Sequence, residues 1–267
     1  HVWAWVEKRG LSTPRMLDAL AKELGLASRQ LGYAGLKDAV AVTQQWISIP
    51  PEAQVEPDAA AAIEGSGWRV LRAVRHTRGL RPGALRGNRF SLVIRGLDPD
   101  EKLDEVQRRV TGIAARGVVN GFGPQRFGKR GDNVDRGLDL LLKTRPRDLR
   151  RIPKHKLRLL ISAVQSEVFH RVLAQRVDHP GSMRIGDLAW LHRNGACFLV
   201  EDAAREQARA DVFEISPTGP LPGPKAPLPG EEIAAQEAEA LASLGLTLES
   251  FAVLPHKLAP GDRRPLR

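Results

Sequence analysis

Gly32-Tyr33-Ala34-Gly35-Leu36-Lys37-Asp38, followed by Ala39-Val40-Ala41-Val42-Thr43-Gln44-Gln45-Trp46-Ile47-Ser48-Ile49, is a glycine-containing loop that leads into a strand-like run. The two glycines of this stretch make the backbone before Asp38 permissive. Asp38 is also the only carboxylate between Glu23 and Glu52. A short loop that feeds a strand holds a side chain at a pocket edge better than a long loop does. Asp38 is therefore a candidate catalytic residue; the alternative is an ordinary turn whose carboxylate accepts from nearby backbone N–H groups.

The composition is that of a basic globular protein. The 267 residues suffice for one large or two ordinary domains, and 42% hydrophobic with 27% charged residues excludes disordered and membrane classes. The formal net charge is +10 and the pI is about 10.3. A surface this basic binds polyanions, and nucleic acid is the first expected partner. An anionic membrane surface is the alternative, but it needs a basic amphipathic helix, and we find no convincing one.

We expect neither a membrane span nor a metal site. No window approaches about eighteen consecutive apolar residues, and the first residues lack the basic lead of a signal peptide. The protein is therefore expected to be soluble and cytoplasmic. Cys197 is the single cysteine, and its apolar neighbours predict a buried core thiol rather than a nucleophile. The histidines show no metal-ligand spacing.

The hydrophobic pattern predicts an α+β fold with a mixed, largely antiparallel sheet, because strands come in hairpin-like pairs rather than in regular β-α-β repeats. Strands are expected at residues 1–7, 39–49, 68–76 and 88–96, and Phe90, Leu92 and Ile94 share one face of the last. Thr13 is the expected N-cap of a helix that Gly25 ends, and Asp98-Pro99-Asp100-Glu101 is expected to start another. Further helices are expected around residues 134–142, 164–173 and 231–244, with short strands from about residue 183. The prolines of Ser216–Gly230 predict a long loop there rather than a helix or a central strand.

Two further loops carry residues suited to RNA. The loop at residues 75–88 combines glycines, which let a ligand approach the backbone, with arginines, which hold phosphate in a fork. These candidate RNA-binding residues are Arg75, Arg78, Arg81 and Arg86; a solvated basic connection is the alternative. The second loop, Phe122-Gly123-Pro124-Gln125-Arg126-Phe127-Gly128, adds Arg126 and is too irregular for a phosphate-binding fingerprint.

Three stretches together carry a resemblance to a known family. Ala34–Asp38 with Thr43–Trp46, then Leu85–Phe90, then Phe122–Gly128 resemble, in order and separation, the signature of the TruD family of pseudouridine synthases. The resemblance implies a catalytic pseudouridine-synthase domain at residues 1–116 and an inserted, family-specific α+β (TRUD) domain at residues 117–255. Residues 256–267 would start the return to the catalytic domain. The family's N-terminal Phe-x-Val-x-Glu element and its C-terminal pattern are not found, so we expect either that the chain is a fragment or that these terminal segments are not resolved.

The resemblance also implies a reaction and its residues. Asp38 would be the catalytic carboxylate, with Lys37, Asn88 and Phe90 as the active-site wall and Phe90 stacked on the flipped base. The implied reaction isomerises a uridine of tRNA, at position 13 in the D arm, to pseudouridine, and it requires no cofactor and no metal. Whether Asp38 attacks the sugar, attacks the base or removes a sugar proton stays open. There are two alternatives. One is the same chemistry on another RNA, and the other is a non-catalytic RNA-binding or chaperone protein that uses the same basic cleft.

Overall fold

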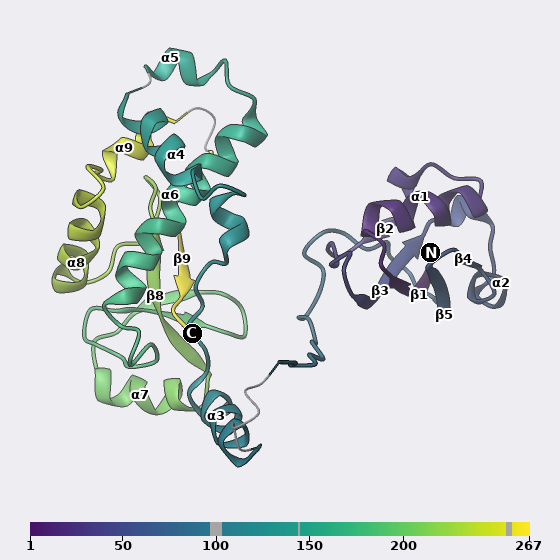
Figure 1. Ribbon diagram of the computed structural model, residues 1–267, viewed down its shortest axis with the longest axis horizontal. Coiled ribbons are helices and arrows are strands. Elements are labelled where there is room, and N and C mark those ends of the chain that lie inside the picture. The colour runs from purple at the N-terminus through teal and green to yellow at the C-terminus, as the bar shows by residue number, and fades with distance from the viewer. Residues whose placement is uncertain (97–102, 144, 255–257) are drawn as a thin grey trace. The chain divides into compact units, whose positions relative to one another are not determined.

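The computed structural model describes residues 1–96, 103–143, 145–254 and 258–267 (Figure 1). The chain divides into two compact units, His1–Gly96 and Leu97–Arg267. Helix α3 (Leu103–Arg116) belongs to the second unit. The boundary between a catalytic and an inserted domain after residue 116 stays a prediction. The predicted helix start at Asp98-Pro99-Asp100-Glu101 and the predicted domain end at residue 255 lie outside the described residues.

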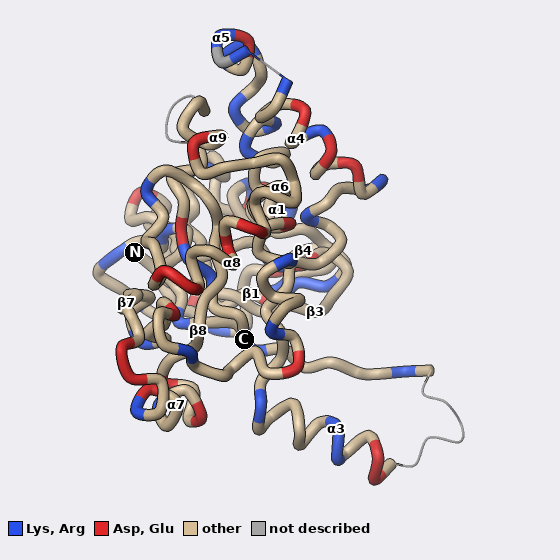
Figure 2. Tube along the Cα trace, turned by 90° about the vertical axis from the view of Figure 1, so that its left-hand side faces the viewer, with Lys and Arg blue, Asp and Glu red and all other residues tan. Residues whose placement is uncertain are grey.

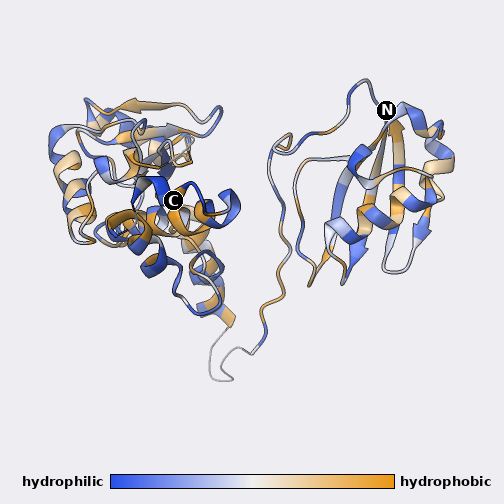
Figure 3. Ribbon diagram, turned by 90° about the horizontal axis from the view of Figure 1, so that it is seen from above, coloured by the Kyte–Doolittle hydropathy of each residue, from blue (hydrophilic) through white to orange (hydrophobic). Residues whose placement is uncertain are grey.

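The first unit is a five-stranded antiparallel sheet in the order β2-β3-β1-β5-β4. Alternation along β1 places Val2, Ala4 and Val6 in the core with Leu17 and Leu20 of helix α1. Figure 3 shows hydrophobic segments (orange) within this sheet. The elements of the unit are β1 (Val2–Arg9), α1 (Thr13–Glu23), β2 (Gly32–Tyr33), β3 (Val42–Ile49), α2 (Pro57–Ala61), β4 (Glu64–Gly65) and β5 (Trp68–Arg75), with short 3-10 turns η1 (Ser28–Gln30) and η2 (Pro51–Ala53).

Helix α1 differs from the prediction at its first turn. The N-cap is Ser12, whose side-chain oxygen accepts from the backbone N–H of Arg15 (3.5 Å), and the predicted cap, Thr13, is already helical. The Thr13 hydroxyl instead accepts from the backbone N–H of Lys37 (2.9 Å). The residue expected to cap the helix therefore anchors the loop that carries Asp38.

The strand predicted at residues 88–96 is not formed. This segment contains no helix or strand, and the side chains of Phe90, Leu92 and Ile94 are 70%, 80% and 66% exposed. A strand needs a neighbour for its N–H and C=O groups, and no strand of the described ranges pairs with it. The prediction was wrong because alternation indicates which face a strand would bury, not whether a partner strand is present.

The second unit surrounds the long helix α6 with a four-stranded antiparallel sheet, in the order β7-β6-β8-β9, and with helices (Figure 1). Val164, Val168 and Val172 of α6 are buried in a core shared with α8 and α9. None of the described helices has the length and apolar character that a bilayer crossing needs. Besides α3, the unit contains η3 (Pro124–Phe127), α4 (Asn133–Leu142), α5 (Pro146–Leu149), α6 (Lys154–Ala174), β6 (Leu188–Leu191), β7 (Cys197–Leu199), α7 (Ala203–Asp211), β8 (Ile215–Leu221), α8 (Glu231–Ala242), α9 (Glu249–Ala252) and β9 (Asp262–Pro265).

The proline-rich segment that begins at Ser216 corrects a second prediction. Its first part lies in β8, a central strand, although we expected a loop. Strand β6 pairs with Ile215–Pro217 and β9 with Thr218–Leu221, so each half of β8 has a partner on one side only. Pro217 contributes its carbonyl, which accepts from the N–H of Leu266 (2.9 Å). Proline fits such a strand because the ladder requires no N–H at these positions.

Strand β9 falls within the segment expected to return to the catalytic domain. It pairs with β8, with Thr218 opposite Pro265 and Leu221 opposite Asp262, and so completes the sheet of the second unit. The side chain of Arg263 on this strand is 1% exposed and donates to both carboxylate oxygens of Glu237 (2.6 and 2.8 Å). These contacts fix the end of the described chain within the second unit.

Candidate active site

Asp38 lies in the irregular loop between β2 and β3, and a buried lysine holds the backbone of this loop. Lys8 occupies the fourth core-facing position of β1 and is 1% exposed. Its Nζ donates to the backbone carbonyl of Asp38 (2.6 Å) and, more weakly, to that of Lys37 (3.4 Å). The Asp38 side chain is exposed. The loop backbone is therefore fixed from the core side while the carboxylate remains open to a ligand.

A second buried group fixes the same loop. The Thr13 hydroxyl accepts from the Lys37 N–H (2.9 Å) and lies 3.3 Å from Oε1 of Gln45, and both Thr13 and Gln45 are buried. Lys37 is thus held through its N–H by α1 and through its carbonyl by β1. Two anchors from different elements restrict the loop more than either would alone, which is the arrangement a preorganised site requires.

The charges around the loop interact. Burial lowers the pKa of Lys8 below the ordinary lysine value, the Asp38 carboxylate opposes this shift, and the Lys37 cation adds to it. Lys8 contacts Asp38 through its backbone carbonyl, and no ion pair joins their side chains in the described part of the chain.

A neighbouring segment of the chain contacts the Asp38 loop. The N–H of Gly83 donates to the Ala34 carbonyl (2.8 Å), and Nζ of Lys37 donates to Oδ1 of Asn88 (2.7 Å). The structure therefore brings together three of the predicted residues, Lys37, Asp38 and Asn88. Phe90 follows two positions later but is largely exposed, and no hydrogen bond or ring contact joins it to the site within the described residues.

The five candidate arginines fall into two groups. Arg75 forms an exposed ion pair with Glu56, and Arg126, in the second unit, donates to the Ser162 hydroxyl (3.0 Å) and lies over the Phe122 ring. The other three carry exposed guanidinium groups that form no ion pair with any described residue. These are Arg78, Arg81 and Arg86. They are better suited to an external anion than the two whose guanidinium groups are already engaged.

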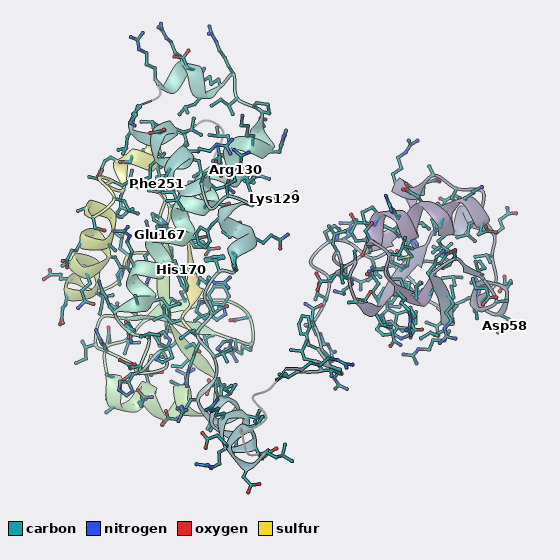
Figure 4. The ribbon with its side chains drawn as sticks, viewed as in Figure 1. Asp58, Lys129, Arg130, Glu167, His170 and Phe251 are labelled. Atoms are coloured by element: carbon teal, nitrogen blue, oxygen red, sulfur yellow. The ribbon has the colours of Figure 1, made fainter. Side chains whose placement is uncertain are left out.

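The Phe122–Gly128 motif is built around His170 of α6. The Phe122 N–H donates to Nε2 of His170 (2.7 Å), and the Phe127 ring lies 5.3 Å from the imidazole. Burial lowers the pKa of His170, Arg264 adds to the shift, and Glu167, one turn earlier on α6 (Figure 4), opposes it. The imidazole is therefore a neutral acceptor, and the motif is part of the scaffold of the second unit.

Neither cysteine nor metal chemistry is suggested by the described part of the chain. Cys197 is half-buried rather than fully buried as expected, and burial raises the pKa of its thiol, which opposes nucleophilic reactivity. No group of three or more His, Cys, Asp or Glu side chains among the described residues is arranged to hold a metal ion.

The comparisons with known proteins identify the family. The family model described as tRNA pseudouridine synthase D (TruD) matches residues 1–144 and 137–267. The chain belongs to the TruD family. The protein named tRNA pseudouridine synthase D from Geobacter metallireducens is 35% identical over 326 aligned residues, which include 100% of this chain and 80% of the relative. The one from Anaeromyxobacter sp. is 41% identical over 256 residues, 94% of this chain and 71% of the relative.

The fold agrees with this membership. A crystal structure assigned to TruD of Methanosarcina mazei superimposes with a TM-score of 0.79 and 21% sequence identity, covering 99% of this chain and 78% of that chain. The predicted resemblance to TruD and the predicted α+β fold are thereby confirmed. The sequence did not predict that Lys8 and Thr13 anchor the Asp38 loop. The available signal was Lys8 itself. It occupies the core-facing position that follows Val2, Ala4 and Val6, where an apolar residue would be expected.

Proposed function

We propose that this TruD chain isomerises uridine to pseudouridine in tRNA, with Asp38 as the catalytic carboxylate. The observation that carries the proposal is an exposed carboxylate on a loop whose backbone is held by buried Lys8 and Thr13. Relatives that are named tRNA pseudouridine synthase D support the same reaction. Position 13 of the D arm is the proposed target, and the cytoplasm is the proposed location.

The reaction needs no external reagent. The bond between C1′ and N1 of the uridine breaks, the uracil turns, and a bond forms between C1′ and C5. The proton of C5 is lost and N1 gains one, so product and substrate have the same composition. The open carboxylate of Asp38 serves as nucleophile or base at the flipped nucleoside. Lys37, the residue before Asp38 in the chain, donates from Nζ to Oδ1 of Asn88 (2.7 Å), so its cation is held within the same loop region.

The basic surface of both units supports a tRNA substrate. In the first unit Arg78, Arg81 and Arg86 are exposed. In the second, Figure 2 shows Lys and Arg residues (blue) on and near α5. The exposed basic residues of this segment, which includes a single acidic residue, Asp148, are Arg145, Arg147, Arg150, Arg151, Lys154, Lys156 and Arg158. Such a distribution neutralises phosphates, so binding is expected to weaken steeply with salt.

The deciding experiment uses tRNA labelled with tritium at C5 of uracil. Wild-type protein is expected to release the label, whereas Asp38→Asn abolishes release and retains tRNA binding. Asp58→Asn is the matched control, because Asp58 is an exposed carboxylate on α2 of the same unit (Figure 4). Binding by wild type without release from any tRNA would refute the enzymatic role and leave RNA binding alone. Mapping pseudouridine in the product tests position 13.

A further inference from the structure

A cleft opens in the first unit, at the opposite end of β1 from Lys8. Its volume is about 1180 Å³, and it lies between the 76–84 loop, the start of β1 and the turn at residues 29–33. Lys8 and Trp3 are five positions apart on β1, roughly 17 Å in an extended strand. The cleft is therefore distinct from the Asp38 site but within a few nucleotides of it.

One wall of this cleft is a preformed aromatic platform. The rings of Trp3 and His76 are stacked, with centroids 3.9 Å apart and an angle of 19° between their planes. The indole N–H of Trp3 donates to the Arg78 carbonyl (2.7 Å), and the Arg78 N–H donates to Nδ1 of His76 (3.1 Å). Both rings are therefore held in orientation before any ligand arrives, and the imidazole is exposed. Flat faces of this kind stack on nucleobases of any sequence.

The rim of the cleft is positively charged. Arg29, Arg78 and Arg81 line it, and its lining contains no Asp or Glu. None of the three guanidinium groups forms an ion pair with another residue in the described ranges. Nearby Arg75, outside the cleft, is instead neutralised by Glu56. Free arginine forks next to an aromatic face are complementary to a phosphate and its attached base.

The loop that forms the cleft is fixed to the sheet. The N–H of Leu80 donates to the Ser48 hydroxyl (2.8 Å), and a Cβ on Gly32 would clash with both residues, so glycine permits the close approach. Further along, the same segment bonds to Ala34 through Gly83 and reaches Asn88 beside Lys37. The cleft and the Asp38 site are thus two parts of one connected surface.

We infer that this cleft binds one nucleotide of the RNA substrate outside the target uridine. The base stacks on the Trp3–His76 platform, and Arg78 and Arg81 hold the adjoining phosphates. The inference rests on the proposed function in taking tRNA as the ligand, but the site acts in binding and not in the chemical step. The occupant is a nucleotide within an RNA chain, not a free nucleotide.

The test compares tRNA affinity and turnover among purified variants. Arg78→Ala/Arg81→Ala is expected to raise Kd and KM for tRNA about 10-fold, with the single-turnover rate at saturating protein unchanged within about 2-fold. The slope of log K against log salt should fall by about 1.4 to 1.8, because two phosphate contacts are lost. Arg15→Ala/Lys22→Ala removes the same charge from exposed positions on α1 and should change neither quantity.

The platform is tested separately. His76→Ala is expected to raise Kd about 5-fold. His76→Phe keeps a flat ring but cannot accept from the Arg78 N–H, so it should raise Kd less than His76→Ala does. Kd values equal to those of the α1 control for all cleft variants would overturn the inference. Competition by micromolar uridine monophosphate would overturn it in favour of a free nucleotide. If wild type binds tRNA through these residues yet releases no tritium, the cleft stands and the proposed reaction fails.

Discussion

Replacing Lys8 with methionine isolates the contribution of the buried ammonium to the Asp38 loop. Methionine has nearly the length of lysine and suits the apolar environment of a core position, but it donates no hydrogen bond and carries no charge. Two backbone carbonyls, those of Asp38 and Lys37, then lose the donor that holds them at 2.6 and 3.4 Å. The substitution therefore acts on loop position rather than on core volume.

The expected magnitude follows from two opposing effects. A hydrogen bond to a charged group contributes about 1.5–3 kcal/mol, which the loop loses. Burial lowers the pKa of Lys8, so its charge is itself costly in the folded state, and removing it returns part of that free energy. Global stability should consequently change little, while the loop moves. A displacement of about 1 Å at a reacting group costs on the order of 100-fold in rate.

The assay is tritium release under single-turnover and steady-state conditions. Lys8→Met is expected to lower kcat about 100-fold while KM for tRNA changes less than about 3-fold. Lys22→Met, an exposed lysine on α1, is the control. A kcat for Lys8→Met within about 3-fold of wild type, with the protein folded, would refute the view that Lys8 positions Asp38. Exposed Lys22 showing the same loss would refute it equally.

The pH dependence of stability supplies an independent check on Lys8. The folded-state pKa lies below the ordinary value of 10.5, so folding penalises the charged form. This penalty is present at neutral pH and is relieved as pH rises through the folded pKa toward 10.5. Urea unfolding should therefore show wild type gaining stability relative to Lys8→Met over that alkaline interval. A constant difference between the two proteins would contradict the buried-charge assignment.

Two further predictions concern the second unit. Asp187 is fully buried and accepts from both terminal nitrogens of Arg176 (2.6 and 3.0 Å). Asp187→Ala should therefore lower the unfolding free energy by about 3–5 kcal/mol in urea titration. The double variant Asp187→Leu/Arg176→Met, which removes both charges, should cost much less. Burial lowers the pKa of His170 below 6.5, so its imidazole does not reduce the unfolding free energy above pH 6.5. As the pH falls from 6.5 toward the folded-state pKa, the unfolding free energy should decrease by at most about 1.4 kcal/mol per pH unit. His170→Gln, whose amide oxygen still accepts from the Phe122 N–H, should reduce this dependence on acid pH. If the unfolding free energies of wild type and His170→Gln fell equally with pH, the role assigned to His170 would be disproved.

The periodicity of hydrophobic residues correctly predicted three of the main elements. Strand β1, helix α1 and helix α6 follow their apolar stripes, because each stripe is buried against elements that the chain supplies. Prediction failed where pairing with a strand far away in the sequence determines whether a segment forms a strand. Strand β8 forms despite its prolines because β6 and β9 flank different halves of it, and residues 88–96 form no strand because no described strand adjoins them.

The candidate site shows the same division. Lys37 and Asp38 were found in one local motif and Asn88 in another, and the structure shows that Lys37 and Asn88 are in contact. Their catalytic roles remain predictions. Lys8 and Thr13 could not be found in this way, since they meet the loop across 30 and 24 residues of sequence and only through its backbone. Because Lys8 and Thr13 bind backbone atoms, the side chains of Lys37 and Asp38 give no indication of these contacts.

Strand β1 links the two parts of the proposed RNA surface. Its core-facing register ends in Lys8, which fixes the Asp38 loop, while its opposite face carries Trp3, which fixes the 76–84 loop through the Arg78 carbonyl. Because successive side chains of a strand point to opposite faces, one rigid element can position both loops independently. A one-residue shift of β1 would exchange these faces and lose both contacts at once. Strand β1, the central strand of its sheet, thus contacts both the loop of the proposed catalytic residue and the loop of the proposed RNA cleft.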